Sequence, residues 1–299
     1  MRKKLSLIAA VGTAALLLAG CSSGGTDTTD DTAGGDETSA TPYEVATDVS
    51  LDGSPTYDAM VAADSVRIGV KEDQPGLGFL DAATGERTGF DIEIARWVAA
   101  SLGFAEDKIE FIAIPSANRE SAIVNGDIDY YVGTYSITDK RKAQIDFAGP
   151  YFITGQGILV AASDDTIKSE DDLVGKTVCS ATGSTPIQNI RDNYPGVDTE
   201  EFETYSQCVD ALNDGQVDAV TTDQAILIGY AAQQPDELKV VGEPFSVEQY
   251  GVGLPLGDDA LRTFINDMFT DGGTTWQAIY DETLGLSGTV VDQPAVDAY

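Results

Sequence analysis

From Val66 onward, short apolar blocks alternate with longer periodic segments. The short blocks are β-branched and apolar, which is typical of buried strands, while the longer segments repeat apolar residues every three to four positions, as on one helix face. In order, the first elements are a strand at Val66–Val70, a helix at Phe90–Leu102, a strand at Ile109–Ile112, a short helix that Ser116 or Asn118 caps and Gly126 ends, and a strand at Ile128–Val132. This β-α-β-α-β order predicts an open sheet with helices on both faces.

A second series of elements follows the segment Phe147–Tyr151. Its members are strands at Gly157–Ala161, Lys176–Cys179, Val217–Val220, Val240–Gly242 and Gln249–Leu254, helices that begin at Pro186 and after Asp223, and a C-terminal helix at Ala260–Tyr280. No sequence repeat relates the two series. Element order and two crossings, near Phe152–Gly155 and Pro244–Val247, predict a second α/β unit inserted before the C-terminal helix. Ligands of such sheets bind outside the carboxyl ends of strands, so we expect a site in the cleft between two lobes.

The start of the chain has a different pattern. Arg2, Lys3 and Lys4 precede the apolar run Leu5–Leu18, and small residues lead from that run to Cys21. This arrangement is typical of an export signal ending in a bacterial lipobox, in which the cysteine is lipidated. An ordinary signal peptide with an incidental cysteine is the alternative. The run is too short to span a membrane, so we predict a signal peptide at 1–20 and a lipid anchor at Cys21.

Residues 21–57 are predicted to form a flexible acidic tether. Between Ser22 and Ser54 the chain consists mainly of Ser, Thr, Gly, Asp and Ala, which cannot bury enough apolar surface to offset the entropy of ordering. The acidic residues between Asp27 and Glu37 could be taken for a metal site, but we interpret them as solvated charge. A tether of this kind would hold a domain away from a membrane.

Composition narrows the class of function. The formal net charge is -33, which argues against nucleic acid as a partner and against adhesion to anionic lipid by charge. Histidine is absent, which removes Ser-His and Cys-His nucleophile pairs and the commonest transition-metal ligand. Carboxylate or lysine chemistry stays open, and we assign no catalytic residue, metal or cofactor. Cys179 and Cys208 remain as a pair, either a disulfide in an oxidising compartment or two buried thiols.

The turn Gly133–Arg141, with sequence GTYSITDKR, follows a predicted strand and leads into a helix. Thr138 is a candidate N-cap because its hydroxyl can accept from a free N–H group of the first helical turn. Lys140, Arg141 and Lys142 occupy that turn, where the helix dipole disfavours each cation by roughly 0.3–1 kcal/mol. The turn is either solvated and basic or the seat of an anion.

Polar side chains follow strand ends in both predicted units. They are Thr134, Ser136 and Arg141 in the first unit and Gly183, Ser184, Thr185 and Asp223 in the second. An arginine can bind a carboxylate through two parallel hydrogen bonds, a helix N-terminus binds anions, and Asp223 could take an ammonium. Together these groups complement a free α-amino acid. Lys71 and Arg119 add cations at similar places, which favours a ligand with a second carboxylate, although each alone could be a solvated cation.

Two motifs resemble those of a known family. GFDIEI at Gly89–Ile94 and SITDKRKAQIDFAGPYF at Ser136–Phe152 are similar to motifs of family 3 of the bacterial extracellular solute-binding proteins, which deliver polar amino acids to ABC importers. The likeness covers Val66–Tyr280. It implies a two-lobed periplasmic-binding-protein-like fold of type II, with an open, mostly parallel sheet flanked by helices in each lobe and a two-strand hinge. Lobe 1 is then expected at 58–152 plus 247–299, and lobe 2 at 153–246.

The resemblance also implies roles for individual residues. Arg141 would hold the ligand α-carboxylate and Asp223 the α-ammonium. The other residues implied at this end of the ligand are Ser136, the Thr134 main chain, Ser184 and Thr185. Residues that look like those placed near the side-chain carboxylate in glutamate- and aspartate-binding members are Lys71, Ser116 and Arg119. The loop Asp73–Phe79 and the pair Cys179 and Cys208 look like glutamate-type members from Gram-positive bacteria. Tyr135 or Phe79 is the candidate aromatic neighbour of the ligand, and packing is the alternative for both.

These implications predict a lipid-anchored, monomeric binding protein at the outer face of the cytoplasmic membrane. It would capture L-glutamate, with L-aspartate as an alternative, and present it to an ABC permease, and it would not be an enzyme. Other interpretations are a binding protein for another polar amino acid such as glutamine, a ligand-sensing module for a membrane receptor, and a dehydratase on the same scaffold.

Overall fold

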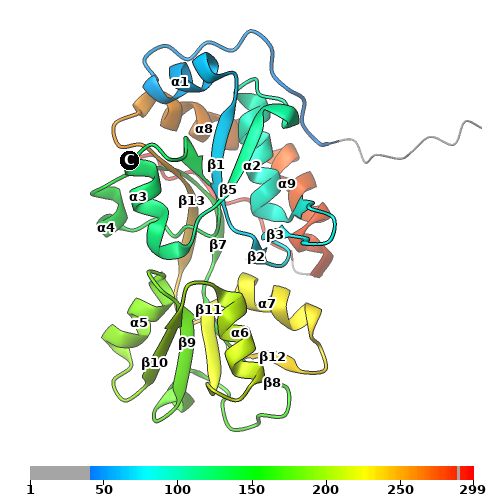
Figure 1. Ribbon diagram of the computed structural model, residues 1–299, viewed down its shortest axis with the longest axis vertical. Coiled ribbons are helices and arrows are strands. Elements are labelled where there is room, and N and C mark those ends of the chain that lie inside the picture. Colours follow the sequence, from blue (N-terminus) through cyan, green and yellow to red (C-terminus); the bar gives the residue numbers. More distant parts are fainter. Residues whose placement is uncertain (1–40, 288–289) are drawn as a thin grey trace, which may run out of the picture. The chain divides into compact units, whose positions relative to one another are not determined.

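The computed structural model describes residues 41–287 and 290–299 and contains two five-stranded sheets flanked by helices (Figure 1). The predicted signal peptide, Cys21 and the first part of the tether lie outside the described residues. We call the part built on the first sheet lobe 1 and the part built on the second sheet lobe 2. The two-lobed α/β fold predicted from the sequence is confirmed.

Lobe 1 combines the first half of the described chain with its C-terminal part. Its elements are α1 (Pro55–Ala63), β1 (Val66–Val70), β2 (Asp73–Gln74), β3 (Gly78–Leu80), β4 (Arg87–Thr88), α2 (Phe90–Ser101), β5 (Ile109–Ala113), α3 (Arg119–Val124), β6 (Tyr130–Tyr131), α4 (Asp139–Lys142), β7 (Asp146–Thr154), β13 (Glu248–Leu254), α8 (Asp259–Asp271) and α9 (Gly273–Glu282). Short 3-10 helices are η1 (Glu106–Lys108), η2 (Ser116–Asn118) and η4 (Leu284–Ser287). The strand order of its main sheet is β5-β1-β6-β13-β7, and β2, β3 and β4 form a small separate sheet.

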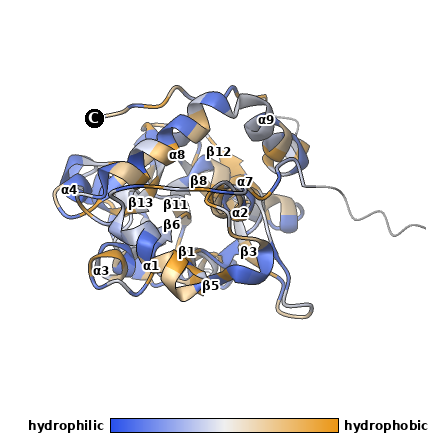
Figure 2. Cartoon of the chain, turned by 90° about the horizontal axis from the view of Figure 1, so that it is seen from above, coloured by the Kyte–Doolittle hydropathy of each residue, from blue (hydrophilic) through white to orange (hydrophobic). Residues whose placement is uncertain are grey.

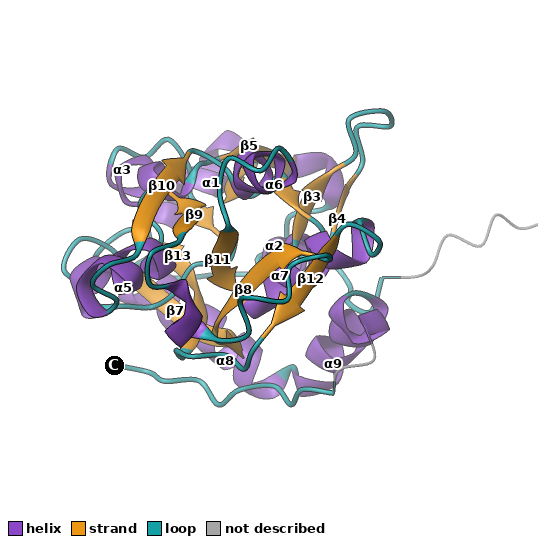
Figure 3. Cartoon of the chain, turned by 90° about the horizontal axis from the view of Figure 1, so that it is seen from below, coloured by secondary structure: helices purple, strands orange, loops and turns teal. Residues whose placement is uncertain are grey.

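Lobe 2 is a continuous insertion. Its elements are β8 (Gln156–Ala161), η3 (Glu170–Leu173), β9 (Thr177–Ala181), α5 (Thr185–Asn193), β10 (Asp198–Phe202), α6 (Tyr205–Asn213), β11 (Ala219–Asp223), α7 (Gln224–Gln233) and β12 (Leu238–Val241). The strand order is β10-β9-β11-β8-β12, and Figure 3 shows α5, α6 and α7 beside these strands. Both main sheets are mixed, because β13 in lobe 1 and β8 in lobe 2 run antiparallel to their neighbours.

The chain crosses between the lobes twice, close to the predicted places. β7 ends at Thr154 and β8 begins at Gln156, while the return crossing lies between β12 and β13. β7 and β13 pair as far as Thr154 and Glu248. A Cβ atom on Gly155 would lie 2.4 Å from the Ser246 carbonyl oxygen, so only glycine fits between the crossing segments. The exact lobe boundaries at 152/153 and 246/247 stay a prediction.

Part of the predicted tether is packed on lobe 1. The Tyr43 hydroxyl donates to Glu93 Oε2 over 2.8 Å, and the Ala46 amide donates to the Ala100 carbonyl over 2.8 Å. Val49 and Leu51 pack against the core. Residues 41–57 therefore belong to the folded domain. Their apolar residues are too sparse to form a periodic pattern, which is why the sequence did not indicate this packing.

The predicted C-terminal helix is two helices, α8 and α9. They meet at Gly272, where a Cβ atom would lie 2.3 Å from Trp97 Cζ2 of α2. The break therefore lets the indole ring approach the backbone. Hydrophobic and hydrophilic residues alternate along α8 (Figure 2), and its Leu261 and Phe269 are buried. No helix in residues 41–287 or 290–299 has the length and apolar character needed to cross a membrane.

Cys179 of β9 and Cys208 of α6 form a disulfide, with their Cα atoms 5.5 Å apart. This confirms the disulfide and excludes the alternative of two buried thiols. The bond fixes the first half of α6 to the central part of the lobe 2 sheet.

Candidate ligand-binding site

The turn Gly133–Arg141 adopts the local structure that its sequence predicts. The Thr138 hydroxyl accepts a hydrogen bond from the Arg141 amide over 3.3 Å, which confirms the N-cap, and α4 is a single turn. Arg141 is buried, whereas Lys140 is exposed and Lys142 pairs with Asp139 over 3.1 Å. Only one of the three cations is therefore directed into the protein.

Arg141 contacts both lobes. Its Nη1 donates to the Ser136 carbonyl over 2.6 Å, its Nε pairs with Glu120 Oε1 at 3.1 Å, and its Nη2 donates to the Gly183 carbonyl of lobe 2 over 3.2 Å. Burial and the nearby Arg119 lower the pKa of Arg141 from its usual value. The guanidinium is thus fixed at the facing ends of the two lobes.

Asp91 holds the backbone of the turn in an uncommon conformation. Thr134 has a φ of 46°, in the left-handed region that side chains other than glycine disfavour. Its amide donates to Asp91 Oδ2 over 2.9 Å, and the Tyr151 hydroxyl donates to Asp91 Oδ1 over 2.8 Å. Burial raises the pKa of Asp91 to about 6, although both hydrogen bonds oppose this shift. The aspartate of the GFDIEI motif therefore positions the turn.

Lys71, Ser116 and Arg119 form one buried group beside this turn. Lys71 Nζ donates to Ser116 Oγ over 2.8 Å, and Arg119 Nε donates to the Ser116 carbonyl over 3.1 Å. Arg119 Nη1 also donates to the Thr134 carbonyl over 3.2 Å, and the whole residue is only 2% exposed. Burial, followed by the nearby Arg119, lowers the pKa of Lys71 to about 7. The structure thus brings the three candidate cations together.

The ring of Tyr135 lies beside both arginines of the site. The Cζ atoms of Arg119 and Arg141 lie 4.3 Å and 4.8 Å from the centroid of its ring, a geometry in which the ring face attracts cations. The ring also packs edge-on against Phe147 at 4.9 Å between centroids. Phe79, the other candidate aromatic residue, lies on β3 of the small sheet.

The second lobe contributes the start of α5. Ser184 caps this helix by accepting from the Ile187 amide over 3.3 Å, and Pro186 stands in its first turn. The hydroxyl oxygens of Thr185 and Ser136 of lobe 1 are 3.3 Å apart. The predicted convergence of these two strand ends is therefore present.

Asp223 is the last residue of β11 and is 3% exposed. The Tyr250 hydroxyl donates to its Oδ2 over 2.6 Å, whereas Oδ1 is buried and has no hydrogen-bond partner within the described residues. Burial, followed by the nearby Glu248, raises the pKa of Asp223 to about 7. A buried carboxylate oxygen with spare capacity is suited to a cationic group such as an ammonium.

Glu248 is a buried carboxylate that the sequence interpretation missed. It begins β13, next to the return crossing, and accepts from the Thr185 hydroxyl over 2.9 Å and from the Ser246 hydroxyl over 2.9 Å. The one available signal was an acidic residue directly before a predicted strand and beside a predicted crossing. Glu248 adds negative charge on the side of the site that faces Asp223.

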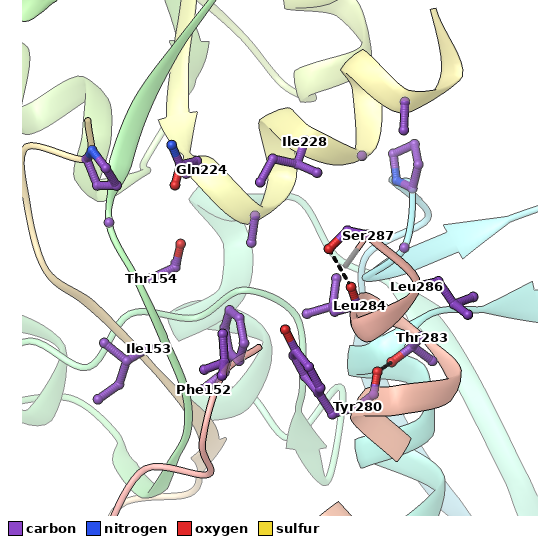
Figure 4. Close-up of a pocket in the computed structure, with 18 of the residues that line it drawn as sticks. Phe152, Ile153, Thr154, Gln224, Ile228, Tyr280, Thr283, Leu284, Leu286 and Ser287 are labelled. Carbon is purple, nitrogen blue, oxygen red and sulfur yellow. Dashed lines mark hydrogen bonds between the residues drawn. The ribbon is translucent and has the colours of Figure 1, made fainter. Parts of the chain in front are cut away.

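Two cavities are close to the region where the lobes meet. A cavity of about 340 Å³ is lined by Ala117 and Asn118 of lobe 1 and by Thr182 and Gln207 of lobe 2, at the edge of the polar cluster. A larger, mostly apolar cavity of about 670 Å³ lies between α7, the first crossing and the segment α9–η4 (Figure 4). The larger cavity has none of the three cations in its lining, so we place the site by the convergence of charged groups.

The fold consists of two α/β lobes joined by paired crossing segments. Cations of one lobe face a free carboxylate oxygen of the other. This arrangement defines a two-lobed binding protein for a small zwitterionic solute. The chain belongs to the bacterial extracellular solute-binding proteins, family 3, whose sequence profile matches residues 66–285. Members of this family bind amino acids outside the cytoplasm and work with ABC transporters.

Similar proteins differ in the ligand that their names state. The glutamate-binding protein GluB of Corynebacterium glutamicum is 41% identical over 255 residues, which cover 81% of this chain and 85% of that protein. A glutamine-binding protein of Geobacillus stearothermophilus is 41% identical over 251 residues, which cover 83% and 90%. The solved structure of an ancestral arginine-binding protein bound to arginine has a TM-score of 0.67 and 36% identity, and covers 74% of this chain and 98% of that one.

Proposed function

We propose that this protein captures L-glutamate, with L-aspartate as an alternative, and delivers it to an ABC importer. The observation that carries the proposal is the gathering of three buried cations: Arg119 and Arg141 lie beside the Tyr135 ring, and Lys71 joins Arg119 through Ser116. One arginine is sufficient for an α-carboxylate. Two further cations, desolvated in a strongly acidic chain, are suited to a second carboxylate on the ligand.

In the proposed complex, Arg141 binds the α-carboxylate beside Ser136 and the Thr134 main chain, and Asp223 binds the α-ammonium. The contacts of both arginines with main-chain carbonyl oxygens support these roles, because they hold the guanidinium groups in place before a ligand arrives. Lys71, Ser116 and Arg119 bind the side-chain carboxylate. Ser184 and Thr185, at the start of α5, contact the ligand from lobe 2.

The ligand would first bind to lobe 1 and then favour contact between the lobes. The ligand can shift the equilibrium between separated and contacting lobes only if it binds more tightly when the lobes are in contact. Asp223 and the start of α5 belong to lobe 2 and supply the additional contacts. We assign no reaction to the site, because its three buried acids have other partners. These are the proposed ammonium and Tyr250 for Asp223, hydroxyl donors for Glu248, and the Thr134 amide and Tyr151 hydroxyl for Asp91.

Glutamine is the second candidate, supported by the 41% identity to a glutamine-binding protein. An amide side chain would leave the charge of Arg119 without an anionic partner, which is costly in a buried site. A lipid anchor at Cys21, at the outer face of the cytoplasmic membrane, remains part of the proposal on the strength of the lipobox alone.

Calorimetric titration with the twenty amino acids tests this function. We expect glutamate to bind, Arg141→Ala to abolish binding, and the exposed neighbour Lys140→Ala to bind as the unmodified protein does. Heat with glutamine or arginine and none with glutamate would show that the proposed ligand is wrong.

A further inference from the structure

Asp73 joins the two lobes and is not itself a proposed ligand contact, although its charge is near enough to Lys71 to raise the pKa of that lysine. It lies on β2 of lobe 1, and its Oδ2 accepts from the Ser206 amide of α6 over 3.1 Å. The Tyr230 hydroxyl of α7 donates to the same Oδ2 over 3.2 Å and to the main-chain carbonyl oxygen of Asp73. One lobe 1 residue therefore binds two helices of lobe 2.

The contact with α6 has a clear electrostatic basis. Ser206 lies in the first turn of α6, a helix of nine residues, where amide groups lack partners within the helix and the dipole attracts negative charge. Thr204 caps the neighbouring Gln207 amide, and the Asp73 carboxylate takes the Ser206 amide. The Cys179–Cys208 disulfide ties α6 to β9, so Asp73 binds to a rigid part of lobe 2.

Backbone packing beside Asp73 is equally close. A Cβ atom on Gly229 of α7 would lie 2.2 Å from the Pro75 carbonyl oxygen, so a side chain at Gly229 would separate the two segments. Beyond Pro75, the 670 Å³ cavity separates α7 from α9 and η4 (Figure 4). On this side, therefore, contact between the lobes depends on the short segment Asp73–Pro75.

We propose that Asp73, seated on Ser206 and Tyr230, is a latch that stabilises contact between the lobes and so sets the affinity for every ligand by the same factor. This inference rests on the proposed function, because it assumes that the ligand binds between the two lobes. Asp73 is a positioning residue, because it contacts two helices of lobe 2 and is not a proposed ligand contact. A contact made only when the lobes meet adds the same free energy to the binding of each ligand, and leaves the preference among ligands unchanged.

The test compares Asp73→Ala and Tyr230→Phe with Glu72→Ala. Glu72 is the exposed neighbour of Asp73 and bonds to Arg87 within lobe 1, so Glu72→Ala removes the same charge without touching the latch. We expect Asp73→Ala and Tyr230→Phe both to raise the Kd for glutamate, by about fivefold or more. Tyr230→Phe keeps the Asp73 charge that acts on Lys71, so this variant should raise the Kd for glutamate and for the next best amino acid by the same factor. The dissociation rate of the ligand should rise.

A change in Kd of less than twofold for either variant, or a change for Tyr230→Phe that differs more than threefold between two ligands, would overturn the latch. Small-angle scattering without added ligand gives a separate readout, in which Asp73→Ala should have a larger radius of gyration than Glu72→Ala. If no amino acid binds the unmodified protein, the proposed function fails and the latch is judged on scattering alone. Equal radii would then overturn it.

Discussion

Arg141 of lobe 1 donates a hydrogen bond to the carbonyl oxygen of Gly183 in lobe 2, over 3.2 Å. Gly183 has a φ of +77°, and a Cβ atom on it would lie 2.7 Å from Ala117 Cα of lobe 1. The residue proposed to bind the α-carboxylate is thus also a point of contact between the lobes. The proposed binding of the ligand and the contact between the lobes therefore involve the same arginine.

Gly183→Ala should weaken glutamate binding at least about tenfold, or about 1.4 kcal/mol, because the methyl group would keep lobe 2 from Ala117. Gly175→Ala is the matched control, since Gly175 has a φ of +78° and no atom within 4 Å of its Cβ position. Both variants should lose about 1–2 kcal/mol of stability through backbone strain. Calorimetry and urea unfolding separate the effects, and equal affinity of the two variants would contradict the prediction.

Arg119→Ala should weaken glutamate binding by about 2 kcal/mol or more, roughly thirtyfold, because one partner of a buried charge pair is removed. The loss for glutamine should be smaller, since an amide carries no charge. Arg191→Ala serves as the control, because Arg191 pairs with Glu201 at the surface of α5. A glutamate Kd within threefold of the unmodified protein would mean that Arg119 does not bind the side-chain carboxylate.

Affinity for glutamate should be greatest near pH 7. The pKa values of Lys71 and Asp223 are both about 7, and binding requires a protonated Lys71 and an ionised Asp223. Asp223 takes up a proton below pH 7, and Lys71 loses a proton above pH 7. The Kd for glutamate should therefore rise both below and above pH 7, with a slope that approaches about tenfold per pH unit. Titrations from pH 5 to 9 measure this profile. Lys71→Met should remove the alkaline limb only, and an unchanged alkaline limb would exclude Lys71 as its source.

The disulfide should contribute about 3.5 kcal/mol to the free energy of unfolding, as expected for a closed loop of this size in the chain-entropy model, with Cys179 and Cys208 separated by 29 positions. The double variant Cys179→Ala, Cys208→Ala should therefore unfold at a lower urea concentration. Dithiothreitol should destabilise the unmodified protein and leave the double variant unaffected. Equal midpoints for the oxidised protein and the double variant would contradict the prediction.

The sequence predicted helices and strands correctly where the pattern of apolar residues is strong. β1 has the predicted bounds, and α2 ends one residue before the predicted Leu102, because β-branched runs and helical periodicity are local properties. α6 was not predicted, although Tyr205, Cys208, Val209 and Leu212 have helical spacing and are buried. The two- and three-residue strands of the small sheet are too short to show any period.

The site was predictable only in part. Arg141, Ser184 and Asp223 follow strand ends, and the doubly wound order of elements brings such ends together. Asp91 and Glu248 were not assigned to it, because their roles arise from contacts with Thr134 and Thr185, which lie 43 and 63 positions away in the chain. No local pattern reports such distant pairs.

The amino-acid sequence by itself determined the α/β class and the strand ends that carry charge, because periodicity, turn residues and residue chemistry are local. It left the state of Cys179 and Cys208 open, and the structure shows the disulfide. Only the tertiary structure decided which cations are buried. It directs Arg141 inward and leaves Lys140 in solvent. It also places Asp73 against α6 and α7. Burial and long-range contact depend on how the elements pack, and packing is a property of the whole chain.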